Sequence, residues 1–254
     1  MGISMESKIF VPAKKPKDWQ PLLADPDKQW KLGYSAMTLA HCWQEANDFP
    51  GSVKDVFRKS KVPLFQDVEM LVAFPEYKIP LPGGRTPSQS DIFVLARGGD
   101  RLISITIEGK VSEPFGNTVF DWFKNASPGK KKRLDFLCEK LQIENRENLN
   151  KIRYQLLHRT ASAIIAAEKF NAPNALMLIH SFSDNKETEE AQFDDYCQFL
   201  ELFDAAGKKD SLVKGRHKGI NLFFAWVKGE KKYLKITNAC PSELPRLQGG
   251  ASGT

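Results

Sequence analysis

Residues 91–110, DIFVLARGGDRLISITIEGK, contain two apolar runs joined by a short polar segment. The runs at 91–96 and 102–107 are rich in β-branched and aromatic residues, which favour strands. The segment between them, RGGDR, has two glycines and an aspartate, and such residues are typical of tight turns. The stretch therefore predicts a β-hairpin, around which the rest of the fold is assembled.

The position of the turn decides which side chains meet across the hairpin. A two-residue turn at Gly99 and Asp100 would pair the strands so that Asp91 lies directly opposite Glu108. A turn at Gly98 and Gly99 would make the two acids diagonal neighbours on the same face. A three-residue loop would separate them. Two of these geometries bring a pair of carboxylates together.

The second strand carries its polar side chains on one face. Alternation places Glu108 and Lys110 opposite a row of three isoleucines that begins at Ile103. Two facing carboxylates repel each other unless a cation compensates them. Carboxylate oxygens are ligands that Mg²⁺ prefers, and one or two from the protein are common. The hairpin therefore predicts a Mg²⁺ or Mn²⁺ site at Asp91 and Glu108, with the Lys110 ammonium beside the ion.

The remaining pattern predicts an α/β domain in which helices flank a central mixed sheet. A strand at 68–81 contains two prolines, which indicates an edge or broken strand. A single domain is expected over 31–235, between an N-terminal arm at 1–30 and a tail at 236–254. The other expected elements are helices at 34–46, 53–59, 130–141, 149–170 and 188–205 and strands at 175–182 and 220–227.

The composition is that of an ordinary globular protein. Of 254 residues, 41% are hydrophobic and 27% are charged, which excludes a disordered or collagen-like chain. Because the sequence has neither an apolar run of membrane-spanning length nor an apolar leader, no membrane association and a cytoplasmic location are expected. The four cysteines are far apart, which disfavours a structural zinc. The net charge of +6 permits a polyanionic partner.

Together these features resemble the PD-(D/E)XK nuclease superfamily, whose restriction-endonuclease-like core is a helix, a three-strand meander, a helix and a further strand. Asp91 matches the acid that opens the second core strand, and Glu108-Gly109-Lys110 matches the (D/E)XK element. Ser90 stands where the family name has proline. The stretches PSQSDIFVLAR, ITIEGKVSEPFG and RYQLLHRTASA are also similar to an uncharacterised bacterial group within this superfamily, over residues 34–230.

The resemblance implies further site residues. Members often add an acid from the first helix, and Glu45 is the best match, with Glu69 and Glu76 as alternatives. In several relatives a glutamine in the helix after the core strands helps to hold the site, and Gln155 fits that place. The carbonyl of Gly109 would join the acids as a metal ligand.

The helix expected at 149–170 also carries candidate phosphate-binding residues. At about 100° per residue, Arg159 shares a polar stripe with Gln155, whereas Arg153 lies on another side. Either guanidinium could hold a phosphate as a planar fork. His158 is interpreted as a packing or hydrogen-bonding residue.

A basic run near the middle of the chain includes Lys130, Lys131 and Lys132. These lysines would follow the backbone of a nucleic acid, although runs of this kind also form ordinary solvated surface. The five tryptophans, Trp122 among them, show no stacking pattern, and most of them are interpreted as core.

These residues predict a metal-dependent nuclease that hydrolyses phosphodiester bonds, with DNA rather than RNA as the expected substrate. The metal would lower the pKa of a bound water, and Lys110 would position that water or stabilise negative charge. The alternative is a non-catalytic module of the same fold that binds nucleic acid or protein. A Schiff-base role for Lys110 is disfavoured, because Glu108 would keep the amine charged. Whether the chain acts alone or as a homodimer is left open.

Overall fold

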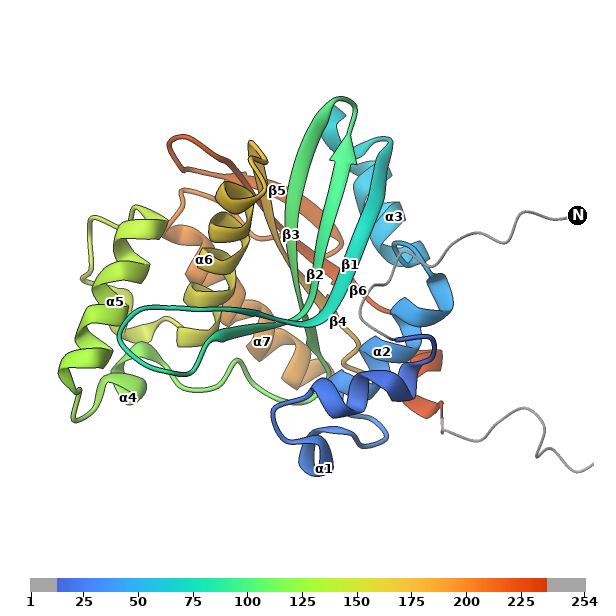
Figure 1. Ribbon diagram of the computed structural model, residues 1–254, viewed down its shortest axis with the longest axis horizontal. Helices are drawn as coiled ribbons and strands as arrows, with labels where there is room; N and C mark the ends of the chain where they lie inside the picture. The colour runs from blue at the N-terminus through green and yellow to red at the C-terminus, as the bar shows by residue number, and fades with distance from the viewer. Residues whose placement is uncertain (1–12, 237–254) are drawn as a thin grey trace, which may run out of the picture.

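The computed structural model describes residues 13–236 (Figure 1). Its centre is a mixed sheet of six strands in the order β1-β2-β3-β4-β6-β5. β1, β2 and β3 form an antiparallel meander, β4 lies parallel to both β3 and β6, and β5 is antiparallel to β6. The strands are β1 (Val68–Ile79), β2 (Ser88–Gly98), β3 (Arg101–Lys110), β4 (Asn174–Ser181), β5 (Ser211–Gly215) and β6 (Asn221–Lys228).

Helices cover both faces of this sheet (Figure 1). On one face, the isoleucines of β3 pack with apolar side chains of α2 (Ser35–Ala46) and α3 (Gly51–Lys59). The opposite face packs against α5 (Pro128–Leu141), α6 (Tyr154–Lys169) and α7 (Lys186–Glu201). The expected class, a mixed sheet flanked by helices, is confirmed. The shorter helical segments are α1 (Pro26–Gln29), α4 (Val119–Phe123) and the 3-10 turns Pro16–Leu22, Pro63–Phe65, Leu149–Lys151 and Lys231–Lys235.

The hairpin of β2 and β3 has the predicted two-residue turn. Gly98 pairs with Arg101, and Gly99 takes a φ of 59°, which glycine adopts at little steric cost. The paired register runs as far as the residues next to Asp91 and Glu108. Its continuation by one residue places these two acids opposite each other.

Several predicted boundaries and elements need correction. The helix expected at 149–170 is a 3-10 turn followed by α6, because Arg153 is extended and forms an isolated β-bridge with Thr118 before the helix begins. The helix expected at 188–205 ends at Glu201. The pattern does not predict α4 and β5, since each has only five residues, too few for a clear period.

The described part of the expected N-terminal arm packs onto the domain. Trp19 is 2% exposed, and its Nε1 donates a hydrogen bond to Gln44 Oε1 on α2 at 2.9 Å. The boundary expected at residue 30 therefore does not separate two structural units. Residues 1–12 of the arm and residues 237–254 of the expected tail lie outside the described residues. Within 13–236, no helix has the length and apolar character needed to cross a membrane.

Candidate active site

One face of β3 is fixed against α6 by side-chain hydrogen bonds. The hydroxyls of Ser104 and Thr106 donate to carbonyl oxygens of α6 at 2.8 and 3.2 Å. Because side chains alternate along a strand, Glu108 and Lys110 continue this row toward the first turn of α6. The prediction that Glu108 and Lys110 share one face is confirmed.

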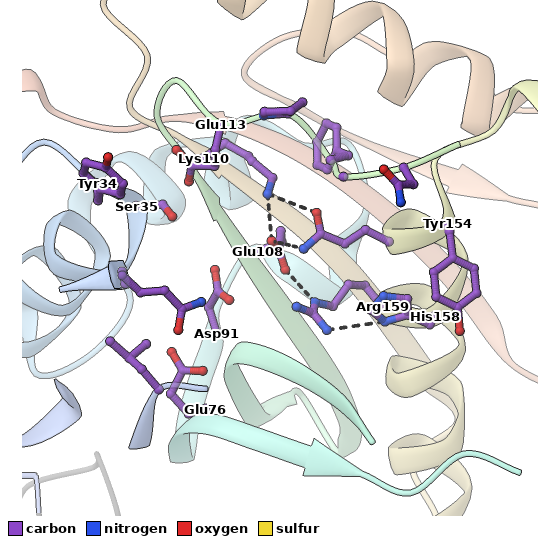
Figure 2. Close-up of a pocket in the computed structure, with 18 of the residues that line it drawn as sticks. Tyr34, Ser35, Glu76, Asp91, Glu108, Lys110, Glu113, Tyr154, His158 and Arg159 are labelled. Atoms are coloured by element: carbon purple, nitrogen blue, oxygen red, sulfur yellow. Dashed lines mark hydrogen bonds and ion pairs between the residues drawn. The ribbon is translucent and has the colours of Figure 1, made fainter. Parts of the chain in front are cut away.

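The end of this row lies in a cavity of about 620 Å³. Figure 2 shows the acids between α2 on one side and α6 on the other. Glu108 and Lys110 are each only 3% exposed, so the polar groups are recessed below the molecular surface. Of the residues singled out from the sequence, the cavity is lined by Glu76, Asp91, Glu108, Lys110, Gln155, His158, Arg159 and Trp122.

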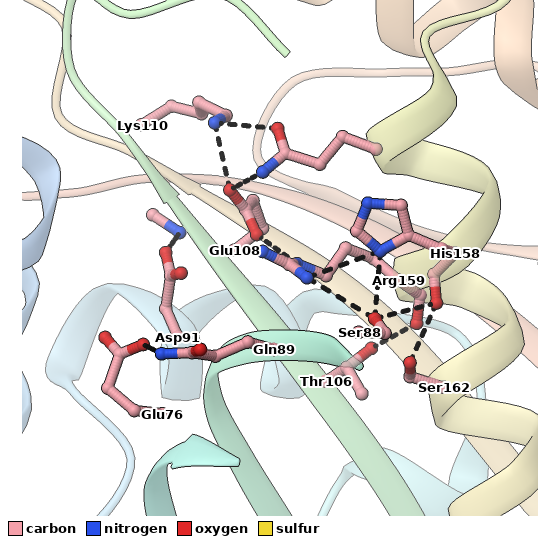
Figure 3. A network of polar contacts seen from close by, with 12 residues as sticks. Glu76, Ser88, Gln89, Asp91, Thr106, Glu108, Lys110, His158, Arg159 and Ser162 are labelled. Atoms are coloured by element: carbon pink, nitrogen blue, oxygen red, sulfur yellow. Dashed lines mark hydrogen bonds and ion pairs between the residues drawn. The ribbon is translucent and has the colours of Figure 1, made fainter. Parts of the chain in front are cut away.

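Glu108 is the centre of a closed hydrogen-bond network (Figure 3). Its Oε1 accepts from Lys110 Nζ at 2.9 Å and from Gln155 Nε2 at 2.7 Å, and its Oε2 accepts from Arg159 Nε at 2.5 Å. Lys110 Nζ also donates to Gln155 Oε1 at 3.0 Å. Burial alone would raise the pKa of Glu108, but Arg159 and Lys110 outweigh burial and hold it at about 2. The carboxylate is therefore ionised at neutral pH.

Two further acids lie on the strands beyond Glu108, Asp91 on β2 and Glu76 on β1. On β1, the residues on either side of Glu76 pair with the residues on either side of Asp91. Glu76, Asp91 and Glu108 therefore occupy one level of the sheet on three adjacent strands. Glu76 has a φ of 53°, a conformation that non-glycine residues seldom adopt and that is more frequent at functional sites.

Asp91 and Glu76 lack the cationic partners of Glu108. Asp91 Oδ2 accepts from the Gly109 amide at 2.8 Å, and Glu76 Oε2 accepts from Gln89 Nε2 at 2.6 Å. Burial, Glu108 and Glu76 together raise the pKa of Asp91 well above its usual range. Burial also raises the pKa of Glu76, to about 7, despite the hydrogen bond from Gln89. This half of the cavity therefore holds two carboxyl groups bonded to neutral donors, and their raised pKa values favour the protonated form.

The absence of a side chain at Gly109 keeps space beside Asp91. A Cβ at this position would lie 3.2 Å from Leu39 Cδ2 and 3.4 Å from Asp91 Oδ2. In a β-strand the N–H and C=O of one residue point to the same neighbouring strand. The Gly109 carbonyl therefore faces the same side as the amide that binds Asp91.

His158 presents a hydrogen-bond donor to the cavity. Its Nδ1 lies 2.9 Å from Ser88 Oγ and 3.4 Å from Arg159 Nη1. Since a guanidinium only donates, Nδ1 is the accepting nitrogen and Nε2 carries the proton. Burial and the charge of Arg159 lower the pKa of His158 well below its usual value, so the ring stays neutral. Figure 3 shows Nε2 directed away from Ser88 and Arg159.

A family model with the description "Domain of unknown function (DUF6946)" matches residues 12–231. The chain belongs to this family. The matched span contains every residue that lines the cavity, so the candidate site lies within the DUF6946 domain. No curated protein and no solved structure matches the chain.

The structure corrects the supporting acid that the resemblance implies. In this DUF6946 domain Glu45 lies on α2 outside the cavity, with its side chain 57% exposed and 3.5 Å from Lys232 Nζ. Glu69 is also outside, and pairs with Arg97 at 2.8 Å. The alternative Glu76 is the acid that reaches the cavity.

The basic residues expected to bind phosphate are placed differently from the prediction. Arg159 reaches the cavity but is 8% exposed and bound to Glu108, so it is not a free phosphate fork. Arg153 pairs with Asp195 at 2.9 Å and does not line the cavity. The three lysines at the start of α5 also lie outside it, with Lys130 bonded to the Trp122 carbonyl and Lys131 and Lys132 exposed.

The sequence pattern does not predict the aromatic residues of the cavity. Trp122 of α4 packs against the core, but it also lines the cavity and stacks on Tyr154, with ring centroids 3.9 Å apart and 8° between the planes. The two residues are far apart in sequence, and α4 has no clear helical period. Tyr154 lies at the start of the stretch RYQLLHRTASA, but the sequence pattern assigns it no role in the cavity.

The donor set suits a hard divalent cation. Within residues 13–236, no three acidic, histidine or cysteine side chains converge as a metal-binding group. Mg²⁺ commonly takes only one or two protein carboxylates and completes its shell with water and substrate phosphates. Glu108 accepts three hydrogen bonds, and a carboxylate offers about four lone-pair sites, which leaves about one for an ion. The carboxyl groups of Asp91 and Glu76, which accept hydrogen bonds from neutral donors, lie beside it.

Proposed function

We propose that the protein is a metal-dependent phosphodiester hydrolase that acts on nucleic acid, with DNA rather than RNA as the expected substrate. The observation that carries the proposal is the meeting of Asp91, Glu108, Lys110 and Gln155 in one recessed cavity. They come from β2, β3 and α6. Along the chain, α2, β1, β2, β3, α6 and β4 follow one another in the order that the PD-(D/E)XK resemblance implies, with α3 before β1 and with α4 and α5 before α6. A cytoplasmic location and action as a monomer or homodimer belong to the same proposal.

The metal would be held by Asp91, Glu108 and the carbonyl of Gly109. Glu76 takes the supporting place that the resemblance assigns to Glu45. A bound Mg²⁺ or Mn²⁺ supplies a water of lowered pKa and stabilises negative charge on the phosphate. A cation between these acids would also favour ionisation of Asp91 and Glu76, whose pKa values are raised by burial and by the charge of Glu108.

Lys110 and Gln155 have distinct roles in this proposal. The Lys110 ammonium is held by Glu108 and Gln155, which orients it toward the place where a phosphate would gain negative charge. Gln155 is a positioning residue, because its amide bonds both Lys110 and Glu108. Arg159 is also a positioning residue, since it holds the second oxygen of Glu108.

A cleavage assay with the full chain tests the proposal. Labelled single-stranded and duplex DNA and RNA are incubated with Mg²⁺ or Mn²⁺, and with EDTA as a blank. We expect metal-dependent cleavage, and a loss of about a hundredfold or more in Lys110→Met, which keeps the length of the side chain. Lys54→Met is the matched control and should cut normally, because Lys54 is a half-exposed residue of α3 that pairs with Asp48 outside the cavity. Cleavage by Lys110→Met at the normal rate contradicts the assigned role.

The alternative function, a non-catalytic binding module, is favoured by one observation. Glu108 is fully neutralised by Arg159 and Lys110, so this part of the site is stable without a metal. A thermal unfolding series with Mn²⁺ separates the two functions. A metal site should raise the melting temperature of the wild type more than that of Asp91→Asn, whereas a module without a metal site should respond equally in both.

A further inference from the structure

The cavity described above forms a recess in the molecular surface, and its polar groups lie at the bottom of this recess. Glu108 and Lys110 are each 3% exposed, and Arg159 is 8% exposed. The recess is bounded by the described N-terminal segment, which contributes Leu23 and Lys28, and on another side by the loop after β3 and by α4. A phosphate can reach these groups only if the strand that carries it enters the recess.

One wall of the recess is aromatic. Trp122 and Tyr154 stack face to face, with 3.9 Å between centroids, and both line the cavity. Tyr34 lies across the recess from Tyr154 (Figure 2), directly before α2, and is 49% exposed. Trp122 and Tyr154 are half-buried, whereas Tyr34 is exposed. Aromatic rings beside a polar recess are the groups on which unpaired bases stack in proteins that bind single strands.

Cationic groups accompany these rings. Lys130 Nζ is bonded to the Trp122 carbonyl at 2.7 Å and lies 5.5 Å from the centroid of the Trp122 ring. Lys28 lines the cavity from the N-terminal segment. Lys28 is therefore inside the cavity, whereas Lys130 lies outside it, against the Trp122 ring. Lysines beside aromatic rings are the groups that proteins offer to the phosphates and bases of a single strand.

We propose that the cavity takes a single nucleic-acid strand, with an unpaired base against Trp122 and Tyr154 and the adjoining phosphate above Lys110, and that it excludes an intact duplex. This inference rests on the proposed function. In a duplex the bases are already stacked and paired, so they cannot reach the aromatic wall without being flipped out. A single strand brings a phosphate and an open base face into the recess at no such cost.

Binding measurements without catalysis test this inference. Fluorescein-labelled single-stranded DNA, single-stranded RNA and a blunt DNA duplex of the same length are titrated into the full chain in EDTA at fixed salt, and anisotropy is recorded. We expect the single strands to bind at least about tenfold more tightly than the duplex. Trp122→Ala should weaken single-strand binding about tenfold, which is the size expected for one lost stacking contact, whereas Trp122→Phe should restore most of it.

Phe120→Ala provides the matched control. Phe120 lies on the same short helix as Trp122 and is 56% exposed, but it does not line the cavity. Its loss should leave binding unchanged. If the duplex binds as tightly as the single strands, if no single strand binds, or if Trp122→Ala binds normally while folded, the inference is wrong. Stronger binding of either DNA or RNA supports it and identifies the preferred sugar.

The same preparations separate this inference from the proposed hydrolase activity. Single-strand binding that depends on Trp122, without metal-dependent cleavage, would support the inference and contradict the proposed function. Metal-dependent cleavage of an intact duplex at the rate of the single strand would support the function and contradict the inference.

Discussion

Glu76 lies level with Asp91 on the neighbouring strand, because the residues flanking one acid pair with the residues flanking the other. Both acids line the recess, where burial raises the pKa of each, and the charge of Glu76 adds to the rise at Asp91. Glu76 is therefore the acid that the tertiary fold adds to the predicted pair of Asp91 and Glu108, and its ionisation should be visible in the stability of the protein.

The first prediction concerns the pH dependence of unfolding in EDTA. The folded state holds the pKa of Glu76 at about 7 instead of the ordinary 4.5. Between these values the unfolded chain releases the proton while the folded protein keeps it, so the free energy of unfolding falls as pH rises from 4.5 to 7. The fall amounts to about 3 kcal/mol from this group.

Urea unfolding at pH 5, 6 and 7 measures this fall. Glu76→Gln should have a smaller fall than the wild type, because it has no proton to release at this position. Glu69→Gln, an exposed acid of the same strand that lies outside the recess, should keep the wild-type slope. Equal slopes in the wild type and in Glu76→Gln would show that the pKa of Glu76 is not raised.

The second prediction concerns the ion pair of Arg159 with Glu108. Arg159→Met leaves one carboxylate oxygen of Glu108 buried without its cationic partner, and breaking a buried pair in this way costs about 3–5 kcal/mol. The double variant Arg159→Met with Glu108→Gln should recover part of that loss, since the buried negative charge is gone. Denaturant unfolding at pH 7 gives both values.

A second arginine at the start of the same helix is the control for this variant. Arg153 pairs with Asp195, and the two side chains are 28% and 16% exposed. Because water screens this pair, Arg153→Met should cost less than Arg159→Met. A larger loss in Arg153→Met would contradict the central place given to Glu108 and Arg159.

The third prediction concerns the proton of His158. Nitrogen-15 correlation spectra of the imidazole should show the tautomer with the proton on Nε2, and the ring should stay neutral down to pH 6, since burial and Arg159 lower its pKa. The signal is assigned by its loss in His158→Gln, which also separates it from buried His180. A proton on Nδ1, or a charged ring at pH 6, would contradict the hydrogen-bond directions described above.

The sequence predicts the hairpin well because the signal is local. Two β-rich runs and the Gly99-Asp100 turn lie within twenty residues, and the turn alone fixes the pairing of Asp91 with Glu108. The resemblance implies a place for Gln155 at the site, and in the structure its amide bonds Glu108 and Lys110.

No local sequence pattern determines which acid joins Asp91 and Glu108 at the site. Glu45 fits the end of a helix, but the packing of α2 turns that end toward Lys232 and the solvent. Glu76 reaches the site only through the long-range pairing of β1 with β2, and Pro75 beside it indicated a broken strand. Trp122 is likewise brought to Tyr154 by tertiary packing.

The central claim is that the acids of the recess hold a divalent cation, and a crystal soaked in Mn²⁺ tests it most directly. We predict an anomalous peak within coordination distance of Asp91 and Glu108, with the Gly109 carbonyl among its ligands and with the peak lost in Asp91→Asn. A fully soaked crystal with manganese bound elsewhere, and with Glu108 still closed on Lys110, Gln155 and Arg159, would contradict the claim.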